Sequence, residues 1–134
     1  MVPGAFVRVL FPTHEKPHRP GLLHIGYVVI TAGPEAVIAY TTSQPWPSTM
    51  PMPMGARYFA AREAARLNQS RPFLMRLDQL AKLPMTRRWF PDLEQPGRGV
   101  IAIAPPALQT DLTLLAVELG RRHRELVEMR GPSA

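Results

Sequence analysis

The stretch GLLHIGYVVITAGPEAVIAYTT, residues 21–42, decides the fold. Two runs rich in apolar and β-branched residues, 21–31 and 36–42, flank the turn signal at residues 32–35, so the stretch predicts a β-hairpin. Gly26 interrupts the first run and predicts a bulge or bend at that position. In an antiparallel hairpin the start of the first strand lies beside the end of the second. These two ends are therefore expected to meet at one end of the sheet.

The flanking sequence supplies further strands and two helices. Alternating or apolar runs at 5–11, 73–83 and 100–104 predict strands. A short helix is expected over 57–67, ending near Asn68, and a longer one over about 110–129 with Thr110 as its N-cap. Residues 12–20, 84–99 and the Pro/Met-rich stretch 44–56 are expected to be irregular. The sequence therefore predicts a mainly β (α+β) fold, a small, strongly bent antiparallel sheet or barrel with a short middle helix and a C-terminal helix.

Length and composition restrict the class of protein. The 134 residues, of 15.0 kDa, fit one domain spanning 1–134. Cysteine is absent, which excludes disulfide scaffolds, thiol nucleophiles and cysteine-ligated zinc. The N-terminal residues do not have the pattern of a secretory signal, and no apolar run approaches the roughly 20 residues of a membrane span. We therefore expect a cytoplasmic protein without a membrane partner.

The net charge of +6 comes almost entirely from arginine. Of 16 basic residues only Lys16 and Lys82 are lysines, against 10 acidic residues. Guanidinium groups bind phosphate bidentately and stack on bases, so the composition favours a polyanionic partner. The excess is densest between residues 57 and 88, where acids are few. GC-rich coding is an equally simple source of the arginines, and the charge alone does not decide between the two.

Common catalytic and metal motifs are missing from the sequence. His14, His18 and His24 are near one another, but their spacing crosses a proline-rich loop and a strand instead of following one helix face. No HExxH, GxGxxG or GxxxxGK[ST] pattern occurs, and the serines lack the context of a nucleophile elbow. No metal site and no cofactor are predicted.

A basic loop and a hydroxyl-rich strand exit form the pair of segments with the clearest chemistry. Residues 16–20 (KPHRP) lead into the first hairpin strand, and residues 38–44 (IAYTTSQ) end the second. If the hairpin forms, Arg19 is expected to meet Thr42 and Ser43. A guanidinium beside hydroxyls and free backbone N–H groups binds phosphate and stabilises negative charge on phosphorus. The simpler alternative is a solvated Arg19 beside an ordinary strand end.

The order of four short motifs resembles that of the PemK/MazF family of toxin endoribonucleases. They are Gly4-Ala5-Phe6-Val7-Arg8-Val9-Leu10-Phe11-Pro12, His18-Arg19-Pro20, Ile38-Ala39-Tyr40-Thr41-Thr42-Ser43-Gln44 and Arg76-Leu77-Asp78-Gln79-Leu80. The resemblance covers most of residues 4–129. It departs from the family pattern at Ala5, where an acidic residue is usual, and at Gly21, which follows the Arg-Pro pair. The long stretch 45–54 is also unusual.

The resemblance implies an SH3-like barrel, a homodimer and metal-independent cleavage of single-stranded RNA. The ribose 2′-OH attacks the adjacent phosphorus and leaves a 2′,3′-cyclic phosphate and a 5′-hydroxyl. The catalytic arginine falls on Arg19 and the catalytic hydroxyl on Thr42, with Ser43 as the neighbouring candidate. Because arginine does not give up its proton, His18 is the expected general base, with His14 or Glu15 in the same loop as alternatives. The implied inhibitor is an antitoxin with a flexible acidic segment.

Residues expected to bind the nucleic acid are basic, amide or aromatic: Lys16, Gln44, Trp46, Arg57, Arg76, Arg87 and Arg88. Trp46 either stacks on a base or packs on its own Pro/Met loop. Trp89 is expected in the core or at a dimer contact. The alternative function is a non-catalytic barrel that binds nucleic acid or a peptide, and a third is an interaction module whose arginines reflect genomic composition.

Overall fold

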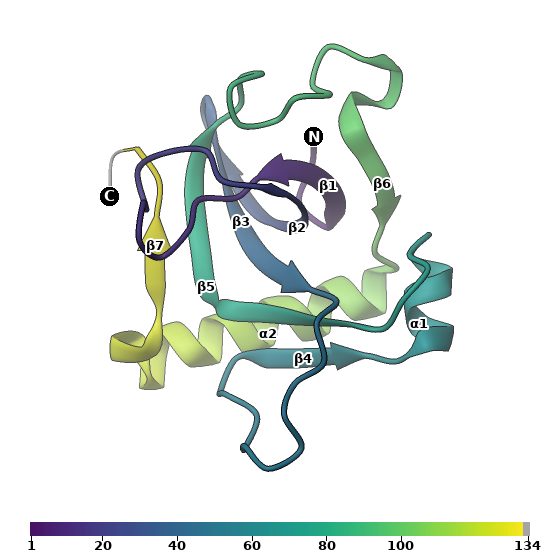
Figure 1. Ribbon diagram of the computed structural model, residues 1–134, viewed down its shortest axis with the longest axis vertical. Helices are drawn as coiled ribbons and strands as arrows, with labels where there is room; N and C mark the ends of the chain where they lie inside the picture. Colours follow the sequence, from purple (N-terminus) through teal and green to yellow (C-terminus); the bar gives the residue numbers. More distant parts are fainter. Residues whose placement is uncertain (133–134) are drawn as a thin grey trace.

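The computed structural model describes residues 1–132 and consists of one curved sheet with two α-helices (Figure 1). Two short 3-10 turns are also present, at Pro96–Gly99 and Arg124–Leu126. In chain order the other elements are β1 (Ala5–Leu10), β2 (Leu23–Ala32), β3 (Glu35–Thr42), β4 (Ala56–Phe59), α1 (Ala61–Arg66), β5 (Phe73–Pro84), β6 (Val100–Ile103), α2 (Pro106–Arg122) and β7 (Glu128–Arg130).

The sheet has the strand order β4-β5-β3-β2-β1-β6, and every neighbouring pair on this path is antiparallel. β7 adds a parallel pairing to β5. The sheet curls as in a half-barrel, and α2 lies across one end of it, against β5 (Figure 1). The predicted fold class, a small bent antiparallel barrel with a short middle helix and a C-terminal helix, is confirmed.

The predicted hairpin is confirmed, with Gly26 opposite Tyr40 and Ala32 opposite Glu35. The bulge expected at Gly26 lies elsewhere, because the register shift falls between Val28 and Ile30. Gly26 serves close packing instead: a Cβ atom there would lie 2.4 Å from Cγ2 of the buried Ile38. The position therefore excludes a side chain.

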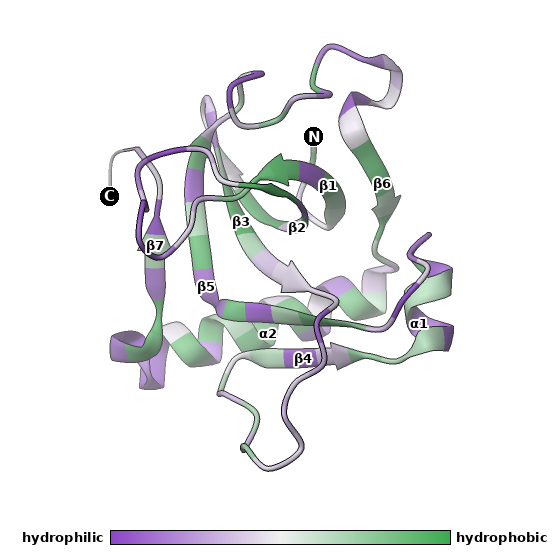
Figure 2. Cartoon of the chain, viewed as in Figure 1, coloured by the Kyte–Doolittle hydropathy of each residue, from purple (hydrophilic) through white to green (hydrophobic). Residues whose placement is uncertain are grey.

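The strands bury apolar side chains on both faces of the sheet. β1 shows this most clearly, since Val7 and Val9 belong to one apolar cluster and Phe6 to the other. The central strands are correspondingly hydrophobic along most of their length (Figure 2). Trp89, which the sequence assigned to the core or to a dimer contact, belongs to the first cluster and is 2% exposed.

The prediction of a helix over residues 57–67 is wrong in its first part. Residues 56–59 form β4, and only Ala61–Arg66 are helical. The strand is favoured because Phe59 pairs with Phe73 on β5, where the two rings stack with centroids 4.5 Å apart. Asn68 adopts a φ of 58° and ends the helical region near the expected residue.

The C-terminal helix begins and ends earlier than predicted. α2 starts at Pro106, because proline suits the first turn of a helix, and ends at Arg122. Thr110 is therefore inside the helix and not at its N-cap, and its Oγ1 donates to the Pro106 carbonyl over 3.1 Å. Within residues 1–132, neither helix has both the length and the apolar composition to cross a lipid bilayer.

Gly26→Ala is expected to lower the free energy of unfolding by about 1–3 kcal/mol, because the added methyl group forces the β2–β3 packing apart. Gly120→Ala is the matched control, since a Cβ there meets nothing within 4 Å. It lies in α2 and is expected to raise the same free energy by about 0.5–1 kcal/mol. Urea denaturation of both variants measures the difference, and equal stabilities would contradict the packing argument.

Candidate active site

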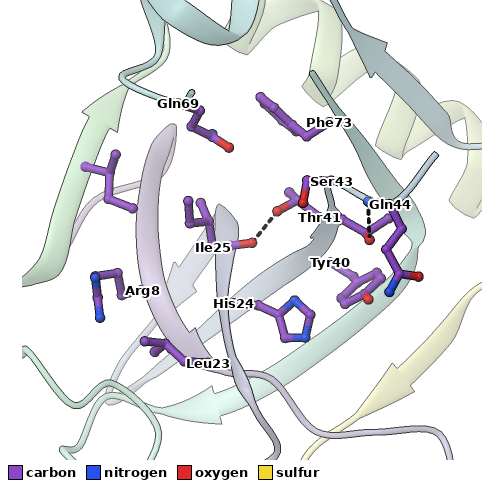
Figure 3. Close-up of a pocket in the computed structure, with 12 residues that line it drawn as sticks. Arg8, Leu23, His24, Ile25, Tyr40, Thr41, Ser43, Gln44, Gln69 and Phe73 are labelled. Carbon is purple, nitrogen blue, oxygen red and sulfur yellow. Dashed lines mark hydrogen bonds between the residues drawn. The ribbon is translucent and has the colours of Figure 1, made fainter. Parts of the chain in front are cut away.

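A hollow of about 430 Å³ opens where β2 begins and β3 ends (Figure 3). The β2–β3 pairing ends at Gly26–Tyr40, and His24 and Thr42 each lie two residues beyond that pair on their strands. The polar residues of its lining come mainly from these two strands and the segment after β3. They are Arg8, His24, Tyr40, Thr41, Thr42, Ser43, Gln44 and Gln69, and the apolar ones are Leu23, Ile25, Phe73 and Ile101.

The two neighbouring threonines of β3 have different roles. Thr41 is 4% exposed, and its hydroxyl donates to the Ile25 carbonyl, which ties β3 to β2. Thr42 Oγ1 accepts the Gln44 N–H over 3.2 Å, so its hydroxyl proton remains available to a ligand. Thr42 and the exposed Ser43 are therefore the hydroxyls that the hollow offers, as the sequence predicted for this strand exit.

Arg8 supplies the guanidinium that lines this hollow. It is the solvent-facing residue of β1, and its Nε lies 2.9 Å from Asp92 Oδ2. The ion pair fixes the guanidinium through Nε, while the two Nη nitrogens take no part in it. Sequence reasoning did not select Arg8. Its placement follows from the β1–β2 register, which sets Arg8 opposite Ile25.

His24 and Tyr40 lie side by side, with ring centroids 5.1 Å apart (Figure 3). Burial lowers the pKa of His24 below its ordinary value, and a backbone hydrogen bond with Thr41 acts in the opposite direction. Both residues also line a second hollow, formed with residues of the 11–14 segment, β5 and β7. The His24–Tyr40 pair therefore separates two adjoining hollows.

Shared residues connect the first hollow to two more on its other side. Ser43, Gln44 and Phe73 also line a third hollow, and Trp46 and Tyr58 line both the third and a fourth. Trp46 is attached to its own loop, because its Nε1 donates to the Met50 carbonyl, and its side chain also lines the third hollow. Stacking of its ring on a base stays a prediction. These four hollows, which share lining residues, are referred to below as the groove.

The basic loop that carries Lys16, His18 and Arg19 does not line the hollow of Thr42. Lys16 and Arg19 are exposed, and Arg19 precedes the first residue of β2 by four positions. His18 is held by a 2.8 Å contact between its Nδ1 and the Gly131 carbonyl. The loop reaches the groove only through residues 11–14, which border the second hollow. The predicted contact between Arg19 and Thr42 stays a prediction.

The arginines expected to bind nucleic acid are largely ion-paired. Arg57 contacts Glu63 over 2.9 Å, Arg76 contacts Asp78 over 2.7 Å and Arg87 contacts Glu94 over 3.6 Å. Arg88 is exposed. The guanidinium of Arg76 also lies 5.6 Å from the centre of the Trp46 ring and supports that wall of the groove. Arg71, which lines the third hollow, is the arginine of this stretch that faces the groove.

β7 fastens the 11–22 segment to the sheet. Arg130 is 6% exposed, donates to the Pro12 carbonyl over 2.9 Å and pairs with Glu128 over 3.0 Å. Glu128 in turn contacts His14 Nδ1 over 3.0 Å. Hydrogen bonding to Arg130 lowers the pKa of Glu128. The C-terminal strand therefore sets the position of the wall of the second hollow.

The three histidines considered for metal binding have separate partners in the fold. Among residues 1–132 no group of three or more His, Asp and Glu side chains is arranged to hold a metal ion.

No protein-family model matches the chain, and no curated protein sequence is significantly similar to it. The functional assignment therefore rests on the chemistry of the groove.

Arg130→Ala is expected to lower the free energy of unfolding by about 3 kcal/mol, because it leaves Glu128 and the Pro12 carbonyl without their buried partner. Faster hydrogen exchange is expected in residues 11–22. The matched control is Arg122→Ala, which removes an exposed ion pair to Glu118 and should change the stability by less than about 0.5 kcal/mol. Equal effects of the two variants would show that β7 does not hold the loop.

Acid is expected to destabilise the protein in two pH windows. The pKa of His24 is lowered on folding, so the unfolded chain takes up that proton first and stability falls as the pH drops below about 6.5. Folding lowers the pKa of Glu128, so its carboxylate stabilises the folded protein above its ordinary pKa of 4.5. That stabilisation is lost as the pH falls below this value. The measurement is the urea midpoint of unfolding from pH 3 to 8. His24→Gln should reduce the change of this midpoint in the first pH window, and Glu128→Gln should reduce it in the second. Unchanged pH profiles would contradict both assignments.

Proposed function

We propose that this protein is the toxin of a toxin–antitoxin pair and a metal-independent endoribonuclease that cleaves single-stranded RNA. The observation that carries the proposal is the hollow at the β2–β3 mouth, where Thr42, Ser43 and Gln44 lie with Arg8 and His24. The motif order described above supports the same reading. A guanidinium and hydroxyls around one small hollow suit a phosphodiester, because both donate hydrogen bonds to phosphate oxygens.

In the proposed reaction the ribose 2′-oxygen attacks the adjacent phosphorus and the bond to the 5′-oxygen breaks. The products are a 2′,3′-cyclic phosphate and a 5′-hydroxyl, and no metal is required because the substrate supplies its own nucleophile. Thr42 donates to a non-bridging oxygen, with Ser43 beside it. A guanidinium stabilises the charge that gathers on the pentacoordinate phosphorus. Arg19 is the candidate from the motif resemblance, and Arg8 is the candidate from position in the hollow.

The neighbouring hollows of the groove support a polymeric substrate. A strand seated at Thr42 and extended along the segment after β3 would meet the third hollow, where Trp46 and the half-exposed Tyr58 offer aromatic surface. Stacking of a base on such a surface contributes about 1–3 kcal/mol and tolerates any base. Arg71 in the same hollow suits a backbone phosphate. These features favour single-stranded nucleic acid over a small molecule.

The motif resemblance supports two partners besides RNA, and both belong to this proposal. One is a second copy of the chain in a homodimer. The other is an antitoxin whose flexible acidic segment lies along the groove and complements the net charge of +6. The proposed compartment is the cytoplasm, where RNA and the antitoxin are found together.

Cleavage of a DNA oligonucleotide that contains one ribonucleotide, assayed in EDTA, tests the proposal directly. The wild-type protein is expected to cut only beside the ribose. Thr42→Val should reduce the rate about 10²–10³-fold, because an oriented donor to the phosphate is lost. Thr113→Val on the exposed surface of α2 is the matched control and should cleave normally. Arg19→Ala and Arg8→Ala, assayed side by side, identify the guanidinium whose loss reduces cleavage more than binding.

Cutting at deoxyribose positions, or cleavage that disappears with EDTA, would exclude the 2′-OH mechanism. If the protein binds single-stranded RNA in a salt-dependent way but never cuts it, the alternative function, a non-catalytic nucleic-acid-binding barrel, is correct. If it does not bind RNA at all, the groove serves another ligand.

A further inference from the structure

His24 is the histidine placed to act on a substrate in the hollow of Thr42. All four histidines fall within residues 1–132, and of these only His24 lines that hollow. It is half-buried near the start of β2 and lines the hollow together with Thr42. The Tyr40 ring packs on it at 5.1 Å and is itself packed on Phe11 at 5.3 Å. These aromatic contacts restrict the orientation of the imidazole.

The other three histidines have structural contacts away from this hollow. His14 Nδ1 contacts Glu128, and His123 Nδ1 lies 3.9 Å from Glu125 Oε1 on the far C-terminal segment. His18, the base expected from the sequence, uses Nδ1 to donate to the Gly131 carbonyl, a contact between its loop and the residue after β7. None of the three lines the hollow that contains Thr42.

The surroundings keep the His24 imidazole in its neutral form near pH 7. Burial lowers its pKa, and the opposing effect of Thr41 is the one expected when a backbone carbonyl accepts a proton from a ring nitrogen. A neutral imidazole has one ring nitrogen with a lone pair that accepts a proton. The titratable and charged groups that share its two hollows are Arg8 on β1, Tyr40 on β3, His14 in the loop, and Glu128 and Arg130 on β7. Glu128 is hydrogen-bonded to Arg130 and His14, and Arg8 is ion-paired with Asp92.

We infer that His24 is the general base of the cleavage reaction, a role that rests on the function proposed above. Its unprotonated ring nitrogen accepts the proton of the 2′-hydroxyl as the 2′-oxygen forms its bond to phosphorus. The bond from phosphorus to the 5′-oxygen breaks, and that oxygen takes a proton from water. The imidazolium then releases its proton to solvent. The step consumes one RNA linkage and yields one cyclic phosphate and one 5′-hydroxyl, with no net change in protons.

The test compares the wild-type protein, His24→Gln and the control His123→Gln on the DNA oligonucleotide with a single ribose, from pH 5 to 8. Wild-type cleavage is expected to fall on the acid side of a pKa below about 6.5 as the base becomes protonated. His24→Gln should lose about 100-fold or more in cleavage rate and should lose this acid limb. Its affinity for the all-deoxy oligonucleotide should remain within twofold of wild type, and His123→Gln should behave as wild type.

A second substrate, with sulfur in place of the bridging 5′-oxygen, distinguishes a general base from a general acid as the role of His24. Sulfur leaves without a proton, so loss of a general acid would be rescued and loss of a general base would not. Rescue of His24→Gln, or a cleavage rate within threefold of wild type, would overturn the role of His24 while the ribonuclease function stands. A wild-type protein that cuts neither substrate would overturn the function itself, and the role with it. If His24→Gln fails to fold, the pH profile of the wild-type protein is the test. A cleavage rate that does not change between pH 5 and pH 7 would overturn the inference.

Discussion

The antiparallel register of β2 and β3 is the constraint on which the groove depends. Gly26 lies opposite Tyr40, and a side chain at position 26 would collide with the buried Ile38, so glycine is needed for the two strands to pack in this register. A slip of one residue would turn every side chain of a strand to the other face. The register therefore places His24, Tyr40 and Thr42 together and leaves Thr41 to tie the strands through the Ile25 carbonyl.

Two peripheral segments complete the groove around this rigid pair of strands. On one side, β7 anchors residues 11–22 through Arg130 and the Gly131 backbone, which also holds His18. On the other, the Pro/Met-rich loop is fixed by Trp46, whose indole donates to its own loop while Arg76 lies near its ring. The groove is thus built on strands and bordered by loops.

The sequence predicts the strands and the hairpin well, because long alternating or β-branched runs and a Gly-Pro turn are strong local signals. The prediction from sequence fails where contacts between residues far apart in the chain determine the local structure. Residues 57–59 look helical alone but form a strand because Phe59 stacks on Phe73. α2 starts at Pro106 instead of Thr110, and residues 128–130 leave the helical pattern to pair with β5. In the site, the hydroxyls of Thr42 and Ser43 were foreseeable from the strand exit. Arg8 and His24 were not selected, since only the curvature and register of the sheet bring them to that exit.

The central claim is that single-stranded RNA binds at the β2–β3 mouth. The most direct measurement is a nuclear magnetic resonance titration of the labelled protein with a short RNA whose ribose 2′-hydroxyls are methylated, so that it cannot be cut by attack of the 2′-oxygen. The account predicts that the largest chemical-shift changes fall on His24, Tyr40, Thr42, Ser43 and Gln44, followed by Trp46 and Arg71. Changes centred instead on the exposed surface of α2, at Leu114 and Val117, would contradict it.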